Sequence, residues 1–481
     1  MHPIILDERL DPPLCVDLDG TLVRTDTLHE SLLSLVRADP LVLFLLPLWL
    51  LSGRAGFKRQ VARRVSLDAA ALPYNQEFLE YLQSCHKSGR KLILVTAADE
   101  SIARQVADHL GIFSSVLASS PKENLKGDAK RLALVEAFGE GRFDYAGNSR
   151  ADFAVWNSAR RTIVVSNSSA FIAMVRRQRS VEREFHSPGV SLRAILKAAR
   201  YKQWVKNVLI FIPAIASHQM FVPAIMVPAA IAFLCFCLTS SSGYLVNDLM
   251  DLAADRIHPE KKLRPFAAGL LAPWIGIALL LLFLTTAATV AGLLLPAEFA
   301  AALAGYLVVT VTYSLYLKKQ LLLDVVVLAG LYSLRVFAGG AATGVFLSPW
   351  LVAFSIFFFL SLALVKRVSE LQGLSKAGKS LTSRRAYSVD DLQPLSIMGM
   401  ASGYISCFIL ALYMNSPEVI RQYHSPRWLW MICPIALYWI SRLWLLAHRG
   451  EVNEDPVLFA MRDRASYFLL LFAGAVFALA I

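Results

Sequence analysis

The sequence predicts two domains of different classes, an N-terminal α/β domain with a parallel sheet and a C-terminal all-α bundle of nine transmembrane helices. Of 481 residues, 56% are hydrophobic and only 17% are charged, which excludes an ordinary soluble enzyme and a disordered chain. The charge is also unevenly distributed. Residues 1–205 are mixed and charge-rich, whereas long apolar runs alternate with short basic loops from Asn207 to Ile481.

Short apolar runs in the first 175 residues predict the strands of the sheet. They lie at Leu14–Val16, Leu92–Val95, Ser115–Leu117, Phe143–Ala146 and Thr162–Val165, with helical patterns between several of them. This alternation is typical of βαβ units and a parallel sheet. We therefore expect an α/β domain over residues 1–175, a basic linker along the membrane surface over 176–200, and a membrane domain over 201–481.

A small cap insertion is expected near residues 28–70. Residues 41–51 have the apolar sequence LVLFLLPLWLL and are followed by a basic stretch that contains Arg54, Lys58, Arg59, Arg63 and Arg64. Eleven apolar residues are too few to span a bilayer. The sequence leaves two interpretations open, a helix lying in the membrane interface or a buried cap helix packed on the sheet.

Nine apolar stretches predict the transmembrane helices. They lie near 207–222, 224–246, 272–293, 297–316, 322–343, 346–365, 394–413, 428–447 and 466–481. One alternating set of loops carries sixteen Lys and Arg residues, and the opposite set carries only Arg421 and Arg427. The positive-inside rule places the first set in the cytoplasm. We expect a multi-pass protein of the inner (cytoplasmic) membrane, with the N-terminal domain cytoplasmic and the C-terminus outside. The net charge of +12 then reflects topology, and no nucleic-acid partner is expected.

Two carboxylates, Asp17 and Asp19, follow the first predicted strand in the string VDLDGTL. The carboxyl ends of parallel strands are where α/β folds bind ligands. The pair is close enough to share a cation, and one member can act as a nucleophile while the other moves a proton. The alternative is that both are turn and capping residues.

Together with its later motifs, this segment resembles the haloacid dehalogenase (HAD) superfamily of phosphotransferases over residues 10–170. The resemblance implies a Rossmannoid sheet with a small helical cap, Asp17 as the nucleophile that forms an aspartyl-phosphate, and Asp19 as the acid/base. It also implies that Thr96, at the end of LILVT, and Lys130 bind the phosphoryl group, with Lys126 as a rival to Lys130.

The last motif departs from the family pattern. It usually reads GDSxxD, whereas this chain has Gly147-Asn148-Ser149-Arg150-Ala151-Asp152. The resemblance implies a Mg²⁺ ion held by Asp17, Asp19, Asn148 and Asp152. An amide oxygen can ligate Mg²⁺ but brings one charge fewer than a carboxylate. An inactive domain retained for docking therefore stays open as an alternative.

A second acidic segment follows the second predicted span. Asp248, Asp251 and Asp255 fall on one narrow helix face, immediately after Asn247. An unpaired carboxylate near membrane depth costs about 3 kcal/mol, so a row of three needs cations. Mg²⁺ bridging a diphosphate would satisfy them. The alternative is a surface helix end where Asp255 pairs with Arg256.

The string NDxxDxxxD with a downstream RP resembles the UbiA superfamily of intramembrane prenyltransferases over residues 190–481, and nine spans match that fold. The continuation DRxHPxKxxRP is most similar to the branch of decaprenyl-phosphate phosphoribosyltransferases. Quinone-type members carry a second aspartate-rich motif after the sixth span, where this chain has Lys366, Arg367 and Glu370. Cations at this point suit a site that holds additional phosphate.

The resemblance implies transfer of 5-phosphoribosyl from phosphoribosyl diphosphate to a polyprenyl (decaprenyl-type) phosphate, with one Mg²⁺ in each domain. Asp248, Asp251 and Asp255 would hold the metal and the diphosphate. Further substrate- or phosphate-binding candidates are Lys206, Asn247, Arg256, Lys261, Arg264, Tyr313, Lys318, Lys366, Arg367 and Glu370. The HAD domain would then remove the 5-phosphate. The alternative is a prenyltransferase that acts on an aromatic acceptor and has a non-catalytic HAD-like domain. Polyprenyl length and homo-oligomerisation are left open.

Overall fold

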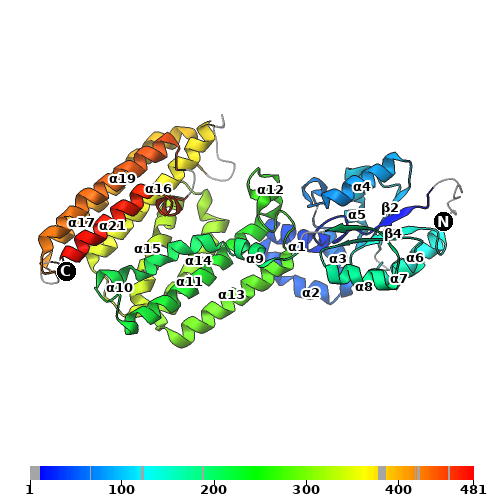
Figure 1. Ribbon diagram of the computed structural model, residues 1–481, viewed down its shortest axis with the longest axis horizontal. Coiled ribbons are helices and arrows are strands. Elements are labelled where there is room, and N and C mark those ends of the chain that lie inside the picture. Colours follow the sequence, from blue (N-terminus) through cyan, green and yellow to red (C-terminus); the bar gives the residue numbers. More distant parts are fainter. Residues whose placement is uncertain are drawn as a thin grey trace. The chain divides into compact units, whose positions relative to one another are not determined.

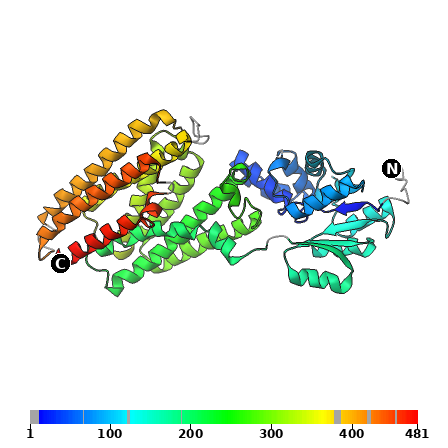
Figure 2. The same ribbon diagram turned by 45° about the horizontal axis from the view of Figure 1, so that its top comes forward.

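The computed structural model describes residues 11–480 except 66, 121–123, 187–188, 377–385, 418, 420–422 and 453–454. The chain forms two compact units (Figures 1 and 2). The first comprises Met1–Ala199 with Tyr244–Leu281, and the second comprises Arg200–Gly243 with Leu282–Ile481. The first unit thus contains the α/β domain together with the segment that carries Asp248, Asp251 and Asp255.

Six parallel strands form one sheet in the order β3-β2-β1-β4-β5-β6. Their bounds are β1 Leu14–Val16, β2 Leu92–Asp99, β3 Ser115–Ser119, β4 Asp144–Gly147, β5 Thr162–Ser166 and β6 Val181–His186. Leu14 pairs with both Leu92 and Asp144, so β1 is central. The predicted parallel α/β domain and its five predicted strands are confirmed.

Helices cover both faces of this sheet, because successive side chains of a strand point to opposite sides. The helices α4 (Gln76–Lys87) and α5 (Glu100–Leu110) pack on the face that carries Leu14 and Val16. On the face that carries Cys15 lie α6 (Asp128–Phe138), α7 (Phe153–Ser158) and α8 (Ser169–Gln178), as Figure 1 shows.

The strand β6 corrects the predicted linker over 176–200. Its Phe185 is buried against Phe78 and Tyr81, with ring centroids 5.1 and 5.3 Å apart. Glu182 pairs instead with Arg161, directly before β5, and Glu184 pairs with Arg176 of α8. The sequence VEREFH is therefore an edge strand, whose charges suit its exposed side. It is followed by α9 (Leu192–Ala198).

The cap lies between β1 and α4. It contains α1 (Thr27–Ala38), the 3₁₀ helix η1 (Pro40–Phe44), α2 (Leu46–Leu50), α3 (Gly53–Ala62) and the 3₁₀ helix η2 (Ala69–Ala71). Asp26 caps α1 by accepting hydrogen bonds from the backbone N–H groups of Leu28 and His29. Leu35, Val42, Phe57 and Val61 form a small core of this cap.

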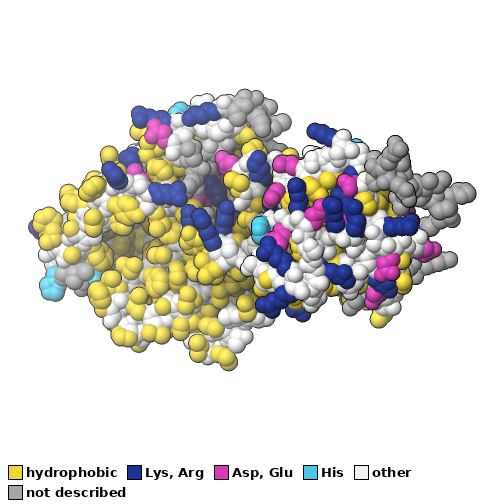
Figure 3. Space-filling model, turned by 45° about the vertical axis from the view of Figure 1, so that its right-hand side comes forward, with side chains coloured by type: hydrophobic (Ala, Val, Ile, Leu, Met, Phe, Trp, Pro, Cys, Tyr) yellow, Lys and Arg dark blue, Asp and Glu magenta, His cyan; other side chains and the backbone are white. Residues whose placement is uncertain are grey.

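In the membrane part, seven helices of the described chain are long and apolar enough to cross a bilayer: Pro223–Met250, Pro273–Leu294, Ala297–Leu315, Leu323–Thr343, Pro349–Lys376, Val389–Met414 and Pro426–Arg449. They correspond to α11, α13, α14, α15, α16, the 3₁₀ helix η7 (Val389–Asp391) with α17 (Leu392–Met414), and the 3₁₀ helix η8 (Pro426–Met431) with α19 (Ile432–Arg449). The last apolar helix, α21 (Arg464–Ala480), is shorter. Hydrophobic side chains cover a broad surface of these helices (Figure 3), and the chain is a multi-pass membrane protein.

The predicted count of nine spans is not confirmed. The segment predicted as the first span, 207–222, folds as the end of a 3₁₀ helix, η4 (Tyr201–Phe211), and the five-residue α10 (Ile212–Ala216). Pro213 occupies the first turn of α10, and His218, with a positive φ of 59°, follows that helix. The polar residues Ser217, His218 and Gln219 follow these two short helices, so the apolar residues of this segment do not form one long α-helix. The orientation of the chain in the bilayer stays a prediction.

The long helices pack around two apolar cores. One is formed by α15, α16, α17 and α19, and the other by η4, α11, α13, α14 and α15. The helices α16, α17, α19 and α21 lie side by side in both views (Figures 1 and 2). Two short elements between long helices carry candidate residues, α12 (Leu252–Ile257) and the 3₁₀ helix η6 (Leu317–Lys319), and a third short helix, α20 (Pro456–Ala460), follows α19.

Candidate functional site

The N-terminal site forms at the carboxyl end of the central strand. Asp17 directly follows β1, and its Oδ1 accepts a hydrogen bond from Lys130 Nζ at 2.7 Å. Lys130 lies in the first turn of α6, is 4% exposed, and also donates to the Tyr145 hydroxyl at 3.0 Å. Lys126 is exposed. The structure thus brings Lys130, and not its rival, to the predicted nucleophile.

Thr96 and Asp19 lie at the same edge. Thr96 follows Val95 in β2, which neighbours β1, and its Oγ1 accepts from the Ala98 N–H at 3.0 Å. Asp19 Oδ1 accepts from the Thr27 N–H at 2.8 Å, so the first turn of α1 fixes this carboxylate. Gly20 has φ +77°, and a Cβ there would lie 1.9 Å from Asn148 Nδ2. The Asn148 amide therefore lies against the Asp17–Asp19 loop.

Asp152 holds the last motif in shape. Its Oδ1 accepts from the Tyr145 hydroxyl at 2.8 Å, and its Oδ2 accepts from the backbone N–H groups of Asn148 and Ser149 and from Ser149 Oγ. These four bonds orient the loop that presents Asn148. The role of Asp152 as a metal ligand stays a prediction.

The donors at this site fit Mg²⁺. No three His, Cys, Asp or Glu side chains are grouped to hold a metal ion anywhere in the described part of the chain. Here, however, two carboxylates, Asp17 and Asp19, lie beside the amide of Asn148, and oxygen donors of these kinds are what Mg²⁺ binds.

Burial changes the acidity of both aspartates. It raises the pKa of Asp17 to about 6, although the Lys130 ammonium opposes the shift. Burial, assisted by the negative charge of Asp26, raises the pKa of Asp19 to about 7. A carboxyl group that remains partly protonated near neutral pH can donate a proton, as the predicted acid/base requires.

These shifts predict that Mg²⁺ binding at this site strengthens as the pH rises. The metal-free folded chain holds protons on Asp17 and Asp19 that the unfolded chain loses near pH 4, so its stability falls as the pH rises from about 4 to about 7. Mg²⁺ binds the ionised carboxylates. We therefore expect Mg²⁺ to raise the unfolding midpoint of the full chain more at about pH 8 than at about pH 5.

The double variant Asp17→Asn/Asp19→Asn provides the control. Mg²⁺ should raise its unfolding midpoint equally at both pH values, by whatever amount Mg²⁺ bound at other sites contributes. If Mg²⁺ raised the unfolding midpoint of the unsubstituted chain equally at both pH values, the assignment of a Mg²⁺ site to Asp17 and Asp19 would be contradicted.

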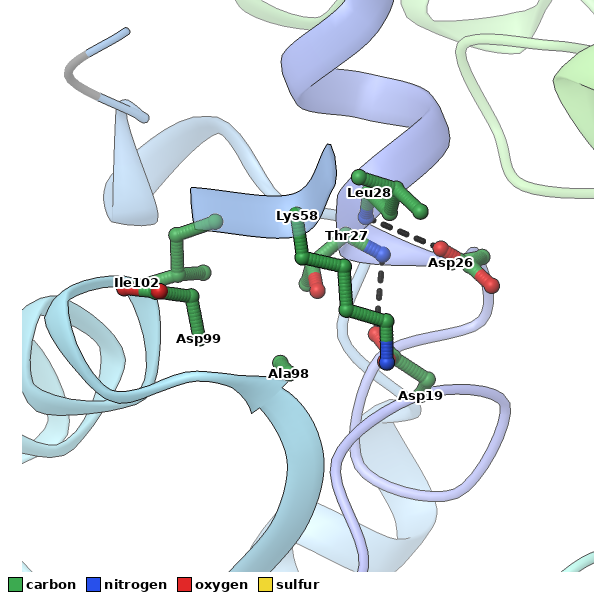
Figure 4. Close-up of a pocket in the computed structure, with 8 residues that line it drawn as sticks. All are labelled: Asp19, Asp26, Thr27, Leu28, Lys58, Ala98, Asp99 and Ile102. Atoms are coloured by element: carbon green, nitrogen blue, oxygen red, sulfur yellow. Dashed lines mark hydrogen bonds between the residues drawn. The ribbon is translucent and has the colours of Figure 1, made fainter. Parts of the chain in front are cut away.

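A pocket opens beside Asp19, between the cap and the sheet (Figure 4). It is lined by Asp19, Asp26, Thr27, Leu28, Lys58, Ala98, Asp99 and Ile102. Lys58 extends from α3 of the cap toward Asp19, and its Nζ donates to the Ala97 carbonyl at 2.6 Å. The sequence showed Lys58 only as one of several basic residues, because its reach into the pocket depends on how the cap folds.

The second acidic site is also in the first unit. Asn247 and Asp248 lie near the end of α11, Asp251 directly precedes α12, and Asp255 lies within α12. Asp248 is 3% and Asp255 1% exposed. Nη1 of Arg264 donates to Asp248 Oδ1 at 3.0 Å and to Asp255 Oδ2 at 2.5 Å, so one guanidinium bridges two buried carboxylates.

This site leaves one buried oxygen unsatisfied. Asp255 Oδ1 has no hydrogen-bond partner, and a buried acceptor without a partner is costly. A carboxylate oxygen in this position fits a divalent cation. The alternative pairing of Asp255 with Arg256 is wrong, because Asp255 pairs with Arg264.

Arg256 binds the cap of the α/β domain. Its guanidinium forms a two-pronged ion pair with Glu30 of α1, at 2.6 and 3.1 Å, and both side chains are 7% exposed. Its Nε also donates to the Ala267 carbonyl at 3.3 Å. The described structure therefore places Arg256, a predicted phosphate ligand, in a contact with the α/β domain. This contact could not be predicted from the sequence, because its two residues lie 226 positions apart.

Removing the charge of Glu30 should destabilise this contact. The change Glu30→Gln would leave Arg256 buried without its counter-charge, which costs about 3 kcal/mol. We expect a lower unfolding midpoint for the full chain, partly recovered in Glu30→Gln/Arg256→Gln, because the double variant leaves no unpaired charge. The control is Glu80→Gln, an exposed glutamate of α4. An equal midpoint for Glu30→Gln and Glu80→Gln would contradict the prediction.

Two predicted cations of the second unit, Lys206 and Lys366, are paired with the same carboxylate. Lys206 of η4 and Lys366 of α16 both donate to Asp455 Oδ2, at 2.6 and 3.3 Å, and the Tyr332 hydroxyl binds the same carboxylate. Burial alone would raise the pKa of Asp455, but the two ammonium groups hold it well below its usual range. Any phosphate bound by these lysines would share them with Asp455.

A second cluster surrounds Arg367. This side chain is fully buried and pairs with Asp324 at 2.6 Å and with Glu370. The Tyr387 hydroxyl donates to Asp324 at 2.5 Å. The sequence singled out Arg367 and Glu370 but not the role of Tyr387, which comes from the loop that precedes α17.

The three remaining candidate residues are half-buried and lie outside these clusters. Lys261 is in the 3₁₀ helix η5 (Lys261–Leu263) of the first unit, and Tyr313 of α14 and Lys318 of η6 are in the second unit.

Comparison with known proteins gives two family matches. Residues 208–477 match the UbiA prenyltransferase family, and residues 14–170 match the haloacid dehalogenase-like hydrolases. The uncharacterized protein y4nM of Sinorhizobium fredii is 38% identical over 474 residues, which cover 97% of this chain and 91% of that protein. The decaprenyl-phosphate phosphoribosyltransferase of Mycolicibacterium smegmatis is 35% identical over 284 residues, 58% of this chain and 89% of that protein.

Among solved structures, a UbiA homolog from Archaeoglobus fulgidus bound to GPP and Mg²⁺ aligns with a TM-score of 0.45 and 17% identity. The alignment covers 59% of this chain and 99% of that one. The UbiA match itself covers more than half of the chain, and the relative from M. smegmatis is matched over nearly its whole length. The chain therefore belongs to the UbiA prenyltransferase family and carries a haloacid dehalogenase-like domain before its membrane helices.

Proposed function

We propose that the chain is a bifunctional membrane enzyme. Its UbiA domain would transfer 5-phosphoribosyl from phosphoribosyl diphosphate to a polyprenyl phosphate, and its HAD-like domain would then remove the 5-phosphate to give polyprenylphosphoryl-ribose. The observation that carries this proposal is the buried Asp248–Arg264–Asp255 cluster with its unsatisfied Asp255 oxygen. The similarity to decaprenyl-phosphate phosphoribosyltransferase supports the choice of donor and acceptor.

In the transfer step, Asp248, Asp251 and Asp255 would hold Mg²⁺, which when bound neutralises charge on the diphosphate. Arg264 and Lys261 bind diphosphate oxygens and stabilise the negative charge that develops there. The bond from ribose C1 to the diphosphate breaks, and an oxygen of the lipid phosphate forms the new bond to C1. Lys206, Lys318, Lys366 and Arg367 hold the remaining phosphate groups.

In the hydrolytic step, Asp17 attacks the phosphorus of the 5-phosphate. The bond to the ribose 5-oxygen breaks, and Asp19 gives its proton to that oxygen. Lys130 and Thr96 hold the phosphoryl oxygens. Asp19 then takes a proton from the water that hydrolyses the aspartyl-phosphate, which releases phosphate and restores Asp17. A Mg²⁺ ion held by Asp17, Asp19 and Asn148 would neutralise phosphoryl charge in both halves of the reaction.

The test supplies purified full chain in nanodiscs with decaprenyl phosphate, phosphoribosyl diphosphate and Mg²⁺. We expect release of diphosphate followed by inorganic phosphate, and mass spectrometry should identify a polyprenylphosphoryl-ribose. Parallel reactions contain a polyprenyl diphosphate and an aromatic acceptor. Turnover of that pair, with none of phosphoribosyl diphosphate, would refute the proposal in favour of a conventional prenyltransferase.

The two active sites would both face the cytoplasm, with the C-terminus on the outer side of the inner membrane. The sixteen basic residues in one set of loops support this orientation. A membrane-impermeant thiol reagent should then label an introduced Asp108→Cys of the α/β domain only after the membrane is opened. Labelling of intact cells would refute this orientation.

A further inference from the structure

The cap of the α/β domain presents an unusual apolar surface. Seven of the eleven residues from Leu41 to Leu51 are large hydrophobics with exposed side chains, from 43% exposed at Leu45 to 83% at Leu51. They lie on η1, on α2 and in the residues that follow each of these helices. An exposed apolar cluster of this kind marks a contact surface rather than a solvated one.

Other side chains of the same segment pack against the core of the cap. Val42 is buried in the cap core with Leu35, and Leu46 and Trp49 pack against that core. The Trp49 ring also carries the guanidinium of Arg64 at 4.6 Å, which ties α2 to the end of α3. The apolar side chains are therefore displayed on a folded support, and the buried cap helix that the sequence left open is wrong for this segment.

Basic residues surround the apolar surface. Residues 37–64 contain six Lys and Arg residues and a single acid, Asp39. Arg37, Arg63 and Arg64 are exposed. A cluster of leucines and a phenylalanine bordered by cations complements the acyl chains and anionic headgroups of a lipid surface. A protein partner would more often be met by a surface rich in aromatic residues, methionine and arginine at its centre.

A bilayer is always available to this surface, because the same chain contains seven helices that can cross a membrane. Covalent attachment to a membrane-embedded domain gives the cap a high effective concentration of lipid. A shallow interfacial contact, too weak to hold a free protein, is sufficient under these conditions. At eleven residues the segment is too short to span the bilayer, so it lies within one leaflet.

We propose that residues 41–51 insert into the lipid surface of the membrane and hold the α/β domain there, with Arg37, Arg63 and Arg64 on anionic headgroups. The occupant of the apolar surface is the lipid leaflet, and not a second copy of the chain. This proposal does not depend on the reaction that either active site performs.

The test measures contact with lipid in the full chain. A single cysteine is introduced as Phe44→Cys or Leu51→Cys, labelled with an environment-sensitive fluorophore, and reconstituted in nanodiscs that contain phosphatidylcholine, phosphatidylglycerol and a spin-labelled lipid quencher. The matched control is Leu132→Cys on α6, because Leu132 is a leucine of the same domain that is 57% exposed. The six native cysteines are all buried, and the unsubstituted chain reports any labelling of them.

We expect loss of emission to the lipid quencher at positions 44 and 51 and none at position 132. Replacing Arg63 and Arg64 with Gln should reduce the quenching of the fluorophore at position 44 in nanodiscs that contain phosphatidylglycerol. The same replacement should change this quenching less in nanodiscs of phosphatidylcholine alone. Quenching at positions 44 and 51 that equals the quenching at 132 would overturn the proposal. So would a blue-shifted emission without lipid quenching, which would identify a protein surface as the occupant.

A second measurement connects the surface to the proposed phosphatase, and this part rests on the proposed function. The variant Leu43→Ser/Phe44→Ser/Leu51→Ser should hydrolyse a water-soluble phosphate ester at the unsubstituted rate and a lipid-linked ribose 5-phosphate more slowly. Equal rates on the lipid substrate would show that lipid contact does not serve catalysis. If neither substrate is hydrolysed by the unsubstituted chain, the proposed phosphatase fails while the quenching result stands by itself.

Discussion

The change Asp255→Asn is expected to lower transfer of phosphoribosyl by about a thousandfold, or about 4 kcal/mol in activation free energy. Asp255 is 1% exposed, accepts a hydrogen bond from Arg264, and has one oxygen without a partner. An amide keeps the size of the side chain but removes the charge that a diphosphate-bound cation requires. The measurement is the initial rate of diphosphate release with saturating substrates and a titration of Mg²⁺.

The control for this variant is Asp390→Asn, the same chemical change at an exposed aspartate of η7. It should leave the rate unchanged. The inorganic phosphate released from a soluble ester by the α/β domain should also persist in Asp255→Asn, which shows that the chain is folded. A rate for Asp255→Asn close to that of the control would exclude Asp255 from the transfer site.

The change Asp17→Asn is expected to lower the rate of inorganic phosphate release by at least about a thousandfold. It should leave the transfer of phosphoribosyl intact. The nucleophilic oxygen is lost, while the bond from Lys130 can still be made to the amide oxygen, so the site should keep its shape. The lipid product should therefore accumulate in its 5-phosphorylated form, which mass spectrometry distinguishes by one additional HPO₃ group.

Asp108→Asn, at an exposed position of α5, provides the matched control and should give the dephosphorylated lipid. The variant Asn148→Asp restores the aspartate that the HAD pattern commonly has and should tighten Mg²⁺ binding, because it adds a charge beside Gly20. Unchanged phosphate release in Asp17→Asn would show that another group carries out the hydrolysis, or that the domain only docks.

The sequence was sufficient for features that depend on local pattern. The buried strands, the Asp17–Asp19 loop at the end of β1 and the long apolar helices follow from apolar runs and their spacing, and the structure confirms them. Lys130 could be placed through the family motif, and its contact with Asp17 decides between it and Lys126. All six residues of β6 were assigned to a linker, because its charged side chains outnumber its single buried phenylalanine.

Features that depend on distant residues could not be predicted in this way. Arg264 lies sixteen residues beyond Asp248, and only the turn between α12 and the following loop brings its guanidinium between two carboxylates. Glu30 meets Arg256 across 226 residues of sequence, and Asp455 meets Lys206 across 249. Charge patterns indicate that such side chains need partners, but they do not say which partner each side chain finds.

The edge strand β6 has a practical consequence for studying the α/β domain in isolation. A fragment that stops at residue 175 would lack Phe185 and would leave the backbone N–H and C=O groups of β5 unpaired along one side. An open edge next to the uncovered rings of Phe78 and Tyr81 invites pairing between copies, so the shorter fragment should precipitate on expression. A fragment that extends through Ala199 keeps β5 paired with β6 and keeps Phe185 on Phe78 and Tyr81, so it is the better choice for soluble production.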